Sequence, residues 1–313
     1  MDHLPERRLS PWHAGEKVMH ERVGVSEHME AYGQRVIRDY MPDQHRDFFH
    51  QLPFIIVGAV DTQGRPWATL LEGPEGFVSS PDPQRLVLVT EPDPQDPAAS
   101  GFDAGSAIGL LGIELHTRRR NRMNGILQRV EAGRLEVAVE QSFGNCPQYI
   151  QQRTYTREET RGGWQGERQD FTALNETLTA MIRNADTFFV ASYVEHEDGQ
   201  RSVDVSHRGG RPGFIMVTGN HLTIPDYAGN QHFNTLGNFQ LNPVAGLLFV
   251  DFFSGNVLQL SGAIELVFDS PMIAAFEGAQ RLWTLDVQQA VLRPRALSIR
   301  WDFQDPVPGR SGQ

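Results

Sequence analysis

Two arginines and a histidine surround a pair of glycines in DVSHRGGRPGF, residues 204–214. The guanidinium groups of Arg208 and Arg211 suit bidentate binding of phosphate or carboxylate. Between them, glycine allows a backbone to approach a ligand closely, and His207 adds another polar side chain. The stretch therefore predicts an anion-binding loop, with a solvated strand end as the alternative.

A second basic stretch, LHTRRRNRMNG, gathers four arginines within five positions: Arg118, Arg119, Arg120 and Arg122. It could form another wall of an anion site, or it could be the exposed tip of a β-hairpin. Aromatic residues do not alternate with these arginines as a base-stacking platform would require, which argues against an RNA-binding role.

A third stretch, IPDYAGNQHFNTLGNFQLNP at 224–243, is rich in amide and hydroxyl groups. NTLGNFQLNP resembles a helical turn that Pro243 closes. Backbone N–H groups at a helix start suit phosphate oxygens. Asn234 and Thr235 could cap this helix, contribute to an anion site, or do both.

The composition is that of a globular protein with about two domains or one large one. The 313 residues are 39% hydrophobic and 21% charged, and the formal net charge is -11. This sign argues against general partners such as nucleic acid or an anionic membrane. The single cysteine, Cys146, permits neither an intramolecular disulfide nor a structural zinc site. Without an apolar signal segment or a run of about 18 apolar residues, we expect a cytoplasmic protein.

The elements that must position these residues are mostly short strands. Residues 54–71, 188–206 and 213–226 each predict a β-hairpin, because two β-rich runs flank a turn sequence. Amphipathic helices are predicted at 25–40 and at 172–185, the second with Thr172 or Asn175 as its cap. A short helix is predicted at 145–153.

The chain also repeats itself at a constant distance. Gly73 and Gly210 are 137 positions apart, and the same offset relates Gly109 to Gly246 and Gly125 to Gly262. One offset at three separate places predicts two copies of a β-rich domain. The predicted segments are a helical N-terminus at 1–50, a first barrel at 51–155, a linker and helix at 156–185, and a second barrel with a C-terminal extension at 186–313.

Differences between the copies indicate where they specialise. Leu70 and Leu71 of the first copy correspond to His207 and Arg208 of the second, whereas the neighbouring glycines are kept. The arginine cluster at 118–122 corresponds to the uncharged FSGNVLQ of the second copy. If the copies pack about a pseudo-twofold axis, these two elements could meet in one asymmetric anion site.

The order of the motifs SHRGGRPGF, IPDYAGN, FNTLGN and AGLLFVDF resembles the pyridoxamine 5'-phosphate oxidase-related family of FMN-binding split barrels. The resemblance covers roughly residues 45–270 and is more specific in the second half. It implies a mainly β (α+β) fold of two tandem, six-stranded split barrels with flanking helices. It also implies FMN at a dimer interface, the phosphate lying against a basic strand and a polar helix start.

Carried onto this sequence, the basic strand is 201–206 running into His207 and Arg208. The Ser-x-Lys phosphate element falls near Asn234 and Thr235, where the lysine is absent. The substrate signature of the true oxidases is also missing, which puts pyridoxamine phosphate in doubt as the substrate. The predicted cofactor-binding residues are Arg118, Arg120, Arg201, Ser206, His207, Arg208, Asn234, Thr235 and Asn238.

We therefore expect an FMN-dependent oxidoreductase, with FAD, a deazaflavin or haem as alternative cofactors. Its partners would be a small-molecule substrate, with NAD(P)H as one candidate, and a second copy in a homodimer. A protein that carries flavin or haem without catalysis is the alternative function. No residue is identified as catalytic.

Overall fold

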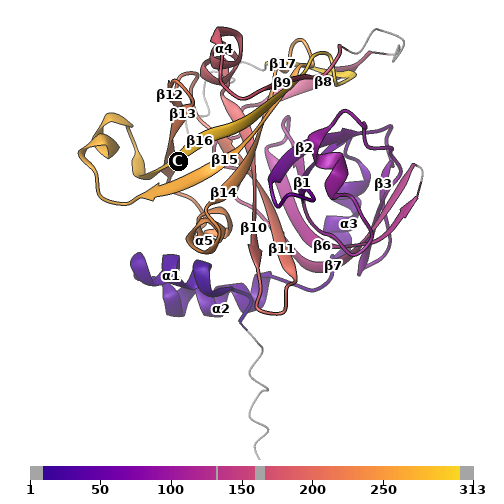
Figure 1. The fold of residues 1–313 in the computed structure, drawn as a ribbon. Helices are drawn as coiled ribbons and strands as arrows, with labels where there is room; N and C mark the ends of the chain where they lie inside the picture. Colours follow the sequence, from indigo (N-terminus) through magenta and orange to yellow (C-terminus); the bar gives the residue numbers. More distant parts are fainter. Residues whose placement is uncertain (1–9, 132, 159–165, 304–313) are drawn as a thin grey trace, which may run out of the picture.

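The fold is described from a computed structural model, which covers residues 10–131, 133–158 and 166–303. It is mainly β with flanking helices, as predicted (Figure 1). The helices are α1 (Ala14–Arg22), α2 (Ser26–Val36), α3 (Asp43–His50), α4 (Glu176–Asn184) and α5 (Asn234–Leu241), with two 3-10 helices, η1 (Pro97–Gly101) and η2 (Pro271–Ala275).

The first sheet is antiparallel, with strand order β2-β1-β5-β6-β7-β4-β3. Its strands are β1 (Phe54–Val60), β2 (Pro66–Glu72), β3 (Val78–Asp82), β4 (Arg85–Leu88), β5 (Ala107–Glu114), β6 (Arg119–Glu131) and β7 (Arg134–Gly144). The sheet has seven strands rather than the six implied by the resemblance, because the short β3 pairs with β4 and extends the edge.

The second sheet follows the same path, β11-β10-β14-β15-β16-β13-β12. Its strands are β10 (Thr187–Glu195), β11 (Arg201–Gly209), β12 (Met216–Thr218), β13 (His221–Tyr227), β14 (Val244–Val250), β15 (Val257–Val267) and β16 (Ala279–Arg293). The three predicted hairpins are β1–β2, β10–β11 and β12–β13. A β-bulge occurs at Asn124/Gly125 in β6 and at Ser261/Gly262 in β15, again 137 positions apart.

The two sheets contact each other reciprocally through glycines. A Cβ atom on Gly109 of β5 would lie 2.7 Å from the carbonyl oxygen of Val203 in β11. The equivalent atom on Gly246 of β14 would lie 2.2 Å from the carbonyl oxygen of Pro66 in β2. Both the glycines and their partners differ by 137 positions, so the halves meet as two subunits of an isologous dimer would. Only glycine permits such backbone approach.

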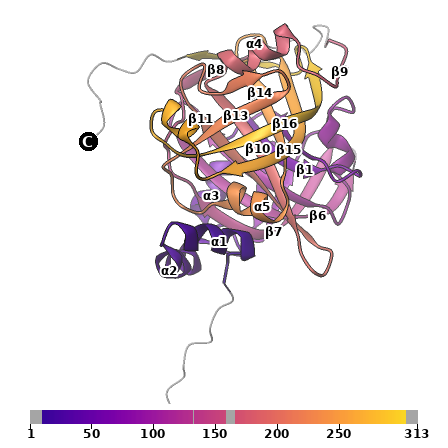
Figure 2. The same ribbon diagram turned by 60° about the vertical axis from the view of Figure 1, so that its left-hand side comes forward.

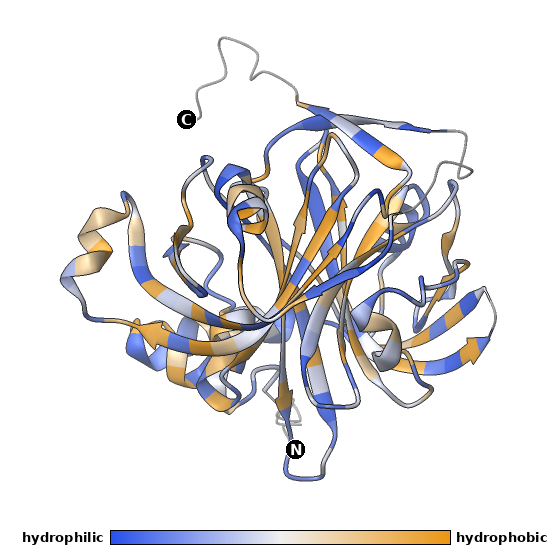
Figure 3. Cartoon of the chain, turned by 45° about the horizontal axis from the view of Figure 1, so that its top comes forward, coloured by the Kyte–Doolittle hydropathy of each residue, from blue (hydrophilic) through white to orange (hydrophobic). Residues whose placement is uncertain are grey.

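Hydrophobic residues are concentrated in the central strands, and hydrophilic residues are frequent in the turns between strands (Figure 3). The amphipathic pattern at 25–40 predicted a helix, and α2 forms there but ends earlier, at Val36. In α4, Asn175 provides the predicted cap by accepting a hydrogen bond from the Leu178 N–H at 2.9 Å. Among the residues that the structure describes, no helix is long and apolar enough to cross a membrane.

Two local predictions differ from the structure. The predicted helix at 145–153 is not formed, and the segment is an irregular turn in which Tyr149 has a positive φ of 65°. The predicted linker at 156–185 lies partly outside the described residues. Next to it, β8 (Arg153–Arg157) pairs with β17 (Ile299–Phe303), and β9 (Gln169–Phe171) joins β16.

Candidate anion and cofactor site

A pocket opens where β6 of the first half meets β11 and the start of α5 in the second half. Arg120, Arg122 and Arg208 line it, with Asp226 as an acidic neighbour. The remaining wall contains polar and aromatic residues, among them Cys146, Tyr149, Ser206, His207, Tyr227, Phe233, Asn234 and Thr235. A strongly acidic chain thus gathers three guanidinium groups around one cavity.

The strand register supports the residue equivalences on which the site prediction depends. His207 pairs with Phe189 across β10–β11, as Leu70 pairs with Ile56 across β1–β2. A Cβ atom on Gly210 would lie 2.5 Å from Phe214, just as one on Gly73 would lie 2.3 Å from Phe77. The glycine and phenylalanine are therefore scaffold in both halves, and the polar residues are specific to the second.

Each arginine is held by a partner from another element. Nη1 of Arg122 donates to Asn234 Oδ1 at 2.7 Å and to Asp204 Oδ1 at 3.0 Å, and its Nη2 donates to Ser206. Nη1 of Arg208 donates to Asp226 Oδ1 at 2.6 Å. The first and second halves therefore build this site together within one chain.

Arg120 and His207 form a direct pair, with Arg120 Nη1 3.0 Å from His207 Nδ1. A guanidinium group can only donate, so Nδ1 must accept and the ring proton lies on Nε2. Burial, and next the positive charges of Arg120 and Arg208, hold the pKa of His207 well below its ordinary value. The imidazole is therefore neutral at pH 7, and its Nε2–H has no partner among the described residues.

The start of α5 faces the same pocket without a cap. Phe233, the N-cap residue, has left-handed backbone angles (φ 58°, ψ 18°), and no side chain accepts from the first turn. Thr235 instead donates to Ser206 at 2.9 Å. The uncapped N–H groups and the helix dipole favour an anion here.

Buried donors without partners support the same conclusion. Nε of Arg122 and Nε of Arg208 are both buried and unpaired within the described chain, as is Nδ2 of Asn145. Buried polar groups are normally hydrogen-bonded. A ligand with several acceptor oxygens, such as a phosphate ester, fits this set of donors.

The equivalent position of the first half is filled by protein. Gln259 of β15 corresponds to Arg122 by the same offset, and its Oε1 accepts from Arg293 Nε at 3.0 Å. Arg293 also pairs with the buried carboxylate of Asp96 at 2.6 Å. Leu70 and an ion pair thus occupy the position that corresponds to the pocket, so within the described residues the first half has no counterpart of the pocket there.

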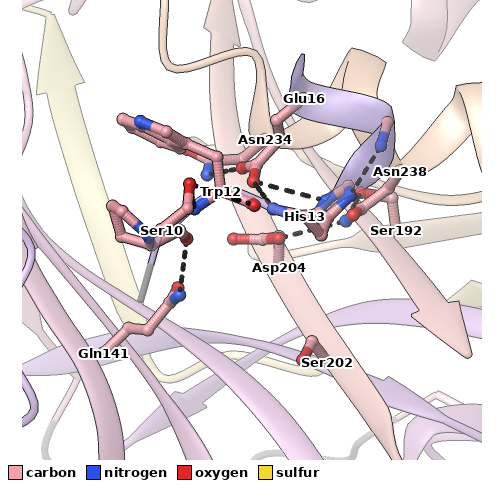
Figure 4. A network of polar contacts seen from close by, with 12 residues as sticks. Ser10, Trp12, His13, Glu16, Gln141, Ser192, Ser202, Asp204, Asn234 and Asn238 are labelled. Carbon is pink, nitrogen blue, oxygen red and sulfur yellow. Dashed lines mark hydrogen bonds and ion pairs between the residues drawn. The ribbon is translucent and has the colours of Figure 1, made fainter. Parts of the chain in front are cut away.

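The structure brings together six of the nine predicted cofactor-binding residues along this pocket: Arg120, Ser206, His207, Arg208, Asn234 and Thr235. The other three lie elsewhere. Arg118 is exposed in the turn before β6, with a φ of 57°. Arg201 lies at the far end of β11, paired with Glu195. Asn238 lies beneath the pocket and donates to Asp204 Oδ2 at 3.0 Å (Figure 4).

Three residues that line the pocket or hold a lining residue in place were missing from the predicted set of cofactor-binding residues. Arg122 lies two positions after Arg120, and strand alternation places both side chains on one face. Tyr149 has a strained backbone and donates from its hydroxyl group to the Ala228 carbonyl at 2.8 Å. Glu16 of α1 accepts from Asn234 Nδ2 at 2.5 Å (Figure 4). For Glu16 the sequence carries no signal beyond a helix start.

Fold and pocket define a mainly β protein of two like halves that share one cationic pocket. Residues 41–161 match the family model of pyridoxamine 5'-phosphate oxidase. This confirms the resemblance, although the match lies on the first half whereas the sequence motifs pointed more strongly to the second. No curated protein matches the chain.

Three of the solved structures that resemble this chain each cover about two fifths of it. HupZ from Group A Streptococcus is 12% identical, covering 40% of this chain and 97% of its own, with a TM-score of 0.30. An FAD-binding protein from Mesorhizobium loti is 13% identical (40% and 97%, TM-score 0.27). The heme storage protein HutZ from Vibrio cholerae is 15% identical (41% and 94%, TM-score 0.25). These TM-scores are too low to support a functional inference.

Proposed function

We propose that the protein binds one FMN per chain in the arginine pocket and acts as a flavin-dependent oxidoreductase. The observation that carries this proposal is the convergence of three arginines, a neutral histidine donor and an uncapped helix start on one cavity. A phosphate ester supplies the negative charge and the acceptor oxygens that these groups lack. The family match on residues 41–161 agrees with this choice of ligand.

Different residues of the pocket would contact different parts of the cofactor. Arg122, Arg208 and the first turn of α5 would hold the phosphate, while Ser206 and Thr235 orient hydroxyl groups toward it. Arg120 keeps its positive charge, because burial and then Arg122 lower its pKa only to about 10. When bound, the flavin would supply the redox chemistry, and nearby guanidinium groups would favour its reduced, anionic form.

A small-molecule substrate, with NAD(P)H as a candidate electron donor, would approach through the adjoining groove. That groove shares Tyr149, Phe214 and Tyr227 with the pocket and continues past Met216 and Phe276. The rings of Tyr149 and Tyr227 stack with centroids 5.5 Å apart at the junction. Their aromatic faces are suited to contact a planar substrate.

Haem carriage is the second candidate. Nε2 of His207 has no partner among the described residues, and it would ligate haem iron in the tautomer that carries the proton on Nδ1, which requires the Arg120 contact to break. Absorbance spectra after loading the protein with haem or with FMN distinguish the two, because ligated haem gives a Soret band and flavin does not.

The decisive experiment replaces His207 and Arg208 together with leucine, which restores the residues of the first half. Flavin fluorescence during titration with FMN should give one site per chain in the wild type. Loss of a charge-assisted hydrogen bond of about 1.5–3 kcal/mol should weaken binding at least about tenfold in the variant. The Asp226 carboxylate keeps Arg281, 3.6 Å away, as an ionic partner.

The matched control is Arg201→Leu, the same change on the same strand but outside the pocket. It should bind FMN as the wild type does. If the His207→Leu, Arg208→Leu protein binds FMN with wild-type affinity, the pocket is not the phosphate site.

A further inference from the structure

The N-terminal helices reach the pocket from behind α5. In both ribbon views α1 lies alongside α5 (Figures 1 and 2). A Cβ atom on Gly15 would lie 2.0 Å from the carbonyl oxygen of Gly237. Conversely, a Cβ atom on Gly237 would lie 2.6 Å from Cγ of Glu16. The two glycines thus let α1 press directly against the first turns of α5.

The carboxyl group of Glu16 is buried at this contact. Its Oε2 accepts from the backbone N–H of His13 at 3.0 Å, and its Oε1 accepts from Nδ2 of Asn234 at 2.5 Å (Figure 4). The other end of the same amide, Oδ1 of Asn234, accepts from Arg122 at 2.7 Å. One asparagine side chain therefore connects α1 to an arginine of the pocket.

We propose that Glu16 is a positioning residue of the anion site, because its carboxyl group fixes the Asn234 amide and through it the Arg122 guanidinium. The inference rests on the proposed function, since it concerns how the same pocket holds an anion. An amide presents a donor at one end and an acceptor at the other. With Glu16 accepting from Nδ2, Oδ1 must face Arg122; a rotated amide would set donor against donor.

The protonation state of Glu16 should then regulate the site. Burial raises the pKa of Glu16 well above its ordinary value, and the nearby Asp204 of β11 raises it further. Hydrogen bonds from the His13 N–H and from Asn234, and the charge of Arg122 in β6, oppose this rise. Protonated Glu16 adds no negative charge behind the pocket, whereas ionised Glu16 does. Anion affinity should therefore fall as pH rises through the raised pKa of Glu16.

The test compares Glu16→Gln and Glu16→Ala with the wild type, and uses Glu21→Ala, an exposed position on the same helix, as the control. FMN dissociation constants are measured from pH 5 to 9 by flavin fluorescence. The alanine variant should bind FMN about tenfold more weakly, because the amide loses its anchor. The glutamine variant keeps an oxygen for Asn234 Nδ2 but has no acceptor for the His13 N–H, so it should bind FMN somewhat more weakly than the wild type at low pH and should lack the decline at high pH. The phosphate group of FMN also ionises in this pH range. Because that effect is the same in the wild type and the three variants, it does not alter the comparison between them.

A second readout requires no cofactor. In protein labelled with ¹⁵N-asparagine, the side-chain signal of Asn234 should shift with pH in the wild type and stay constant in Glu16→Gln. If the wild type binds no FMN, the proposed function fails, and the Asn234 signal still tests the Glu16 link. If FMN binds but Glu16→Ala binds it equally well, or the Asn234 signal does not respond to pH, the positioning role is refuted.

Discussion

Substituting Arg293 with methionine tests whether an ion pair fills the position in the first half that corresponds to the pocket. Arg293 and Asp96 are each only 4% exposed, and Arg293 Nη2 lies 2.6 Å from Asp96 Oδ2. The arginine also reaches Gln259 at 3.0 Å and Asp93 at 3.1 Å. Its loss leaves a buried carboxylate without a cation, which typically costs about 3–5 kcal/mol. Gln259, Thr69 and the Ala98 N–H still donate to Asp96, so we expect the lower end of that range.

The free energy of unfolding is measured by urea titration for the wild type, Arg293→Met and a control, Arg201→Met. The control removes a partly exposed ion pair with Glu195, at 3.2 Å, and should cost at most about 1 kcal/mol. The double variant Asp96→Asn, Arg293→Met should lose less than the sum of the single variants, since neither charge is then left alone. If Arg293→Met lowers the free energy of unfolding no more than Arg201→Met does, the inference is refuted that this ion pair fills the position of the first half that corresponds to the pocket.

Two further outcomes follow from the packing and the charges. Gly246→Ala should destabilise the protein by about 1–3 kcal/mol or more in urea titrations, because its Cβ would lie 2.2 Å from the Pro66 carbonyl oxygen. Gly144→Ala is its control, since the new methyl would meet only Asn121 Oδ1 at 3.6 Å, and an equal loss in both would contradict the close contact between the halves. Burial and then Arg122 lower the pKa of His232 to about 3, so its folded-state pKa lies below the unfolded value of about 6.5. Stability from this group is therefore present above pH 6.5 and is lost as pH falls toward 3. In His232→Phe, the free energy of unfolding should fall less steeply between pH 7 and 4 than in the wild type. If the fall is the same in both proteins, groups other than His232 cause it.

Much of the fold could be predicted from local patterns. The hairpin β10–β11 follows from two β-rich runs around a turn, and the offset between Gly109 and Gly246 predicted the repeat. The exchange of Leu70 and Leu71 for His207 and Arg208 pointed to a strand end that lines the pocket. These signals are local, or they compare the chain with itself, so no knowledge of distant contacts was needed.

The failures have physical reasons as well. Arg118 and Arg201 resemble the pocket arginines in type, but one lies in a turn and the other at the far end of its strand. A cluster of like residues does not say which of them face the pocket; that depends on where the strand begins and on its alternation. The helix predicted at 145–153 was replaced by a turn that lines the pocket.

The sequence by itself determined the class of fold, the internal repeat and the residue types suited to an anion, because strand periodicity, turn residues and charge are properties of neighbours along the chain. Only the tertiary structure decided which arginines share one cavity. Arg122 meets Asn234 across 112 positions, and Asn234 meets Glu16 across 218. Such contacts depend on how the two sheets and α1 pack, and no local pattern encodes that packing.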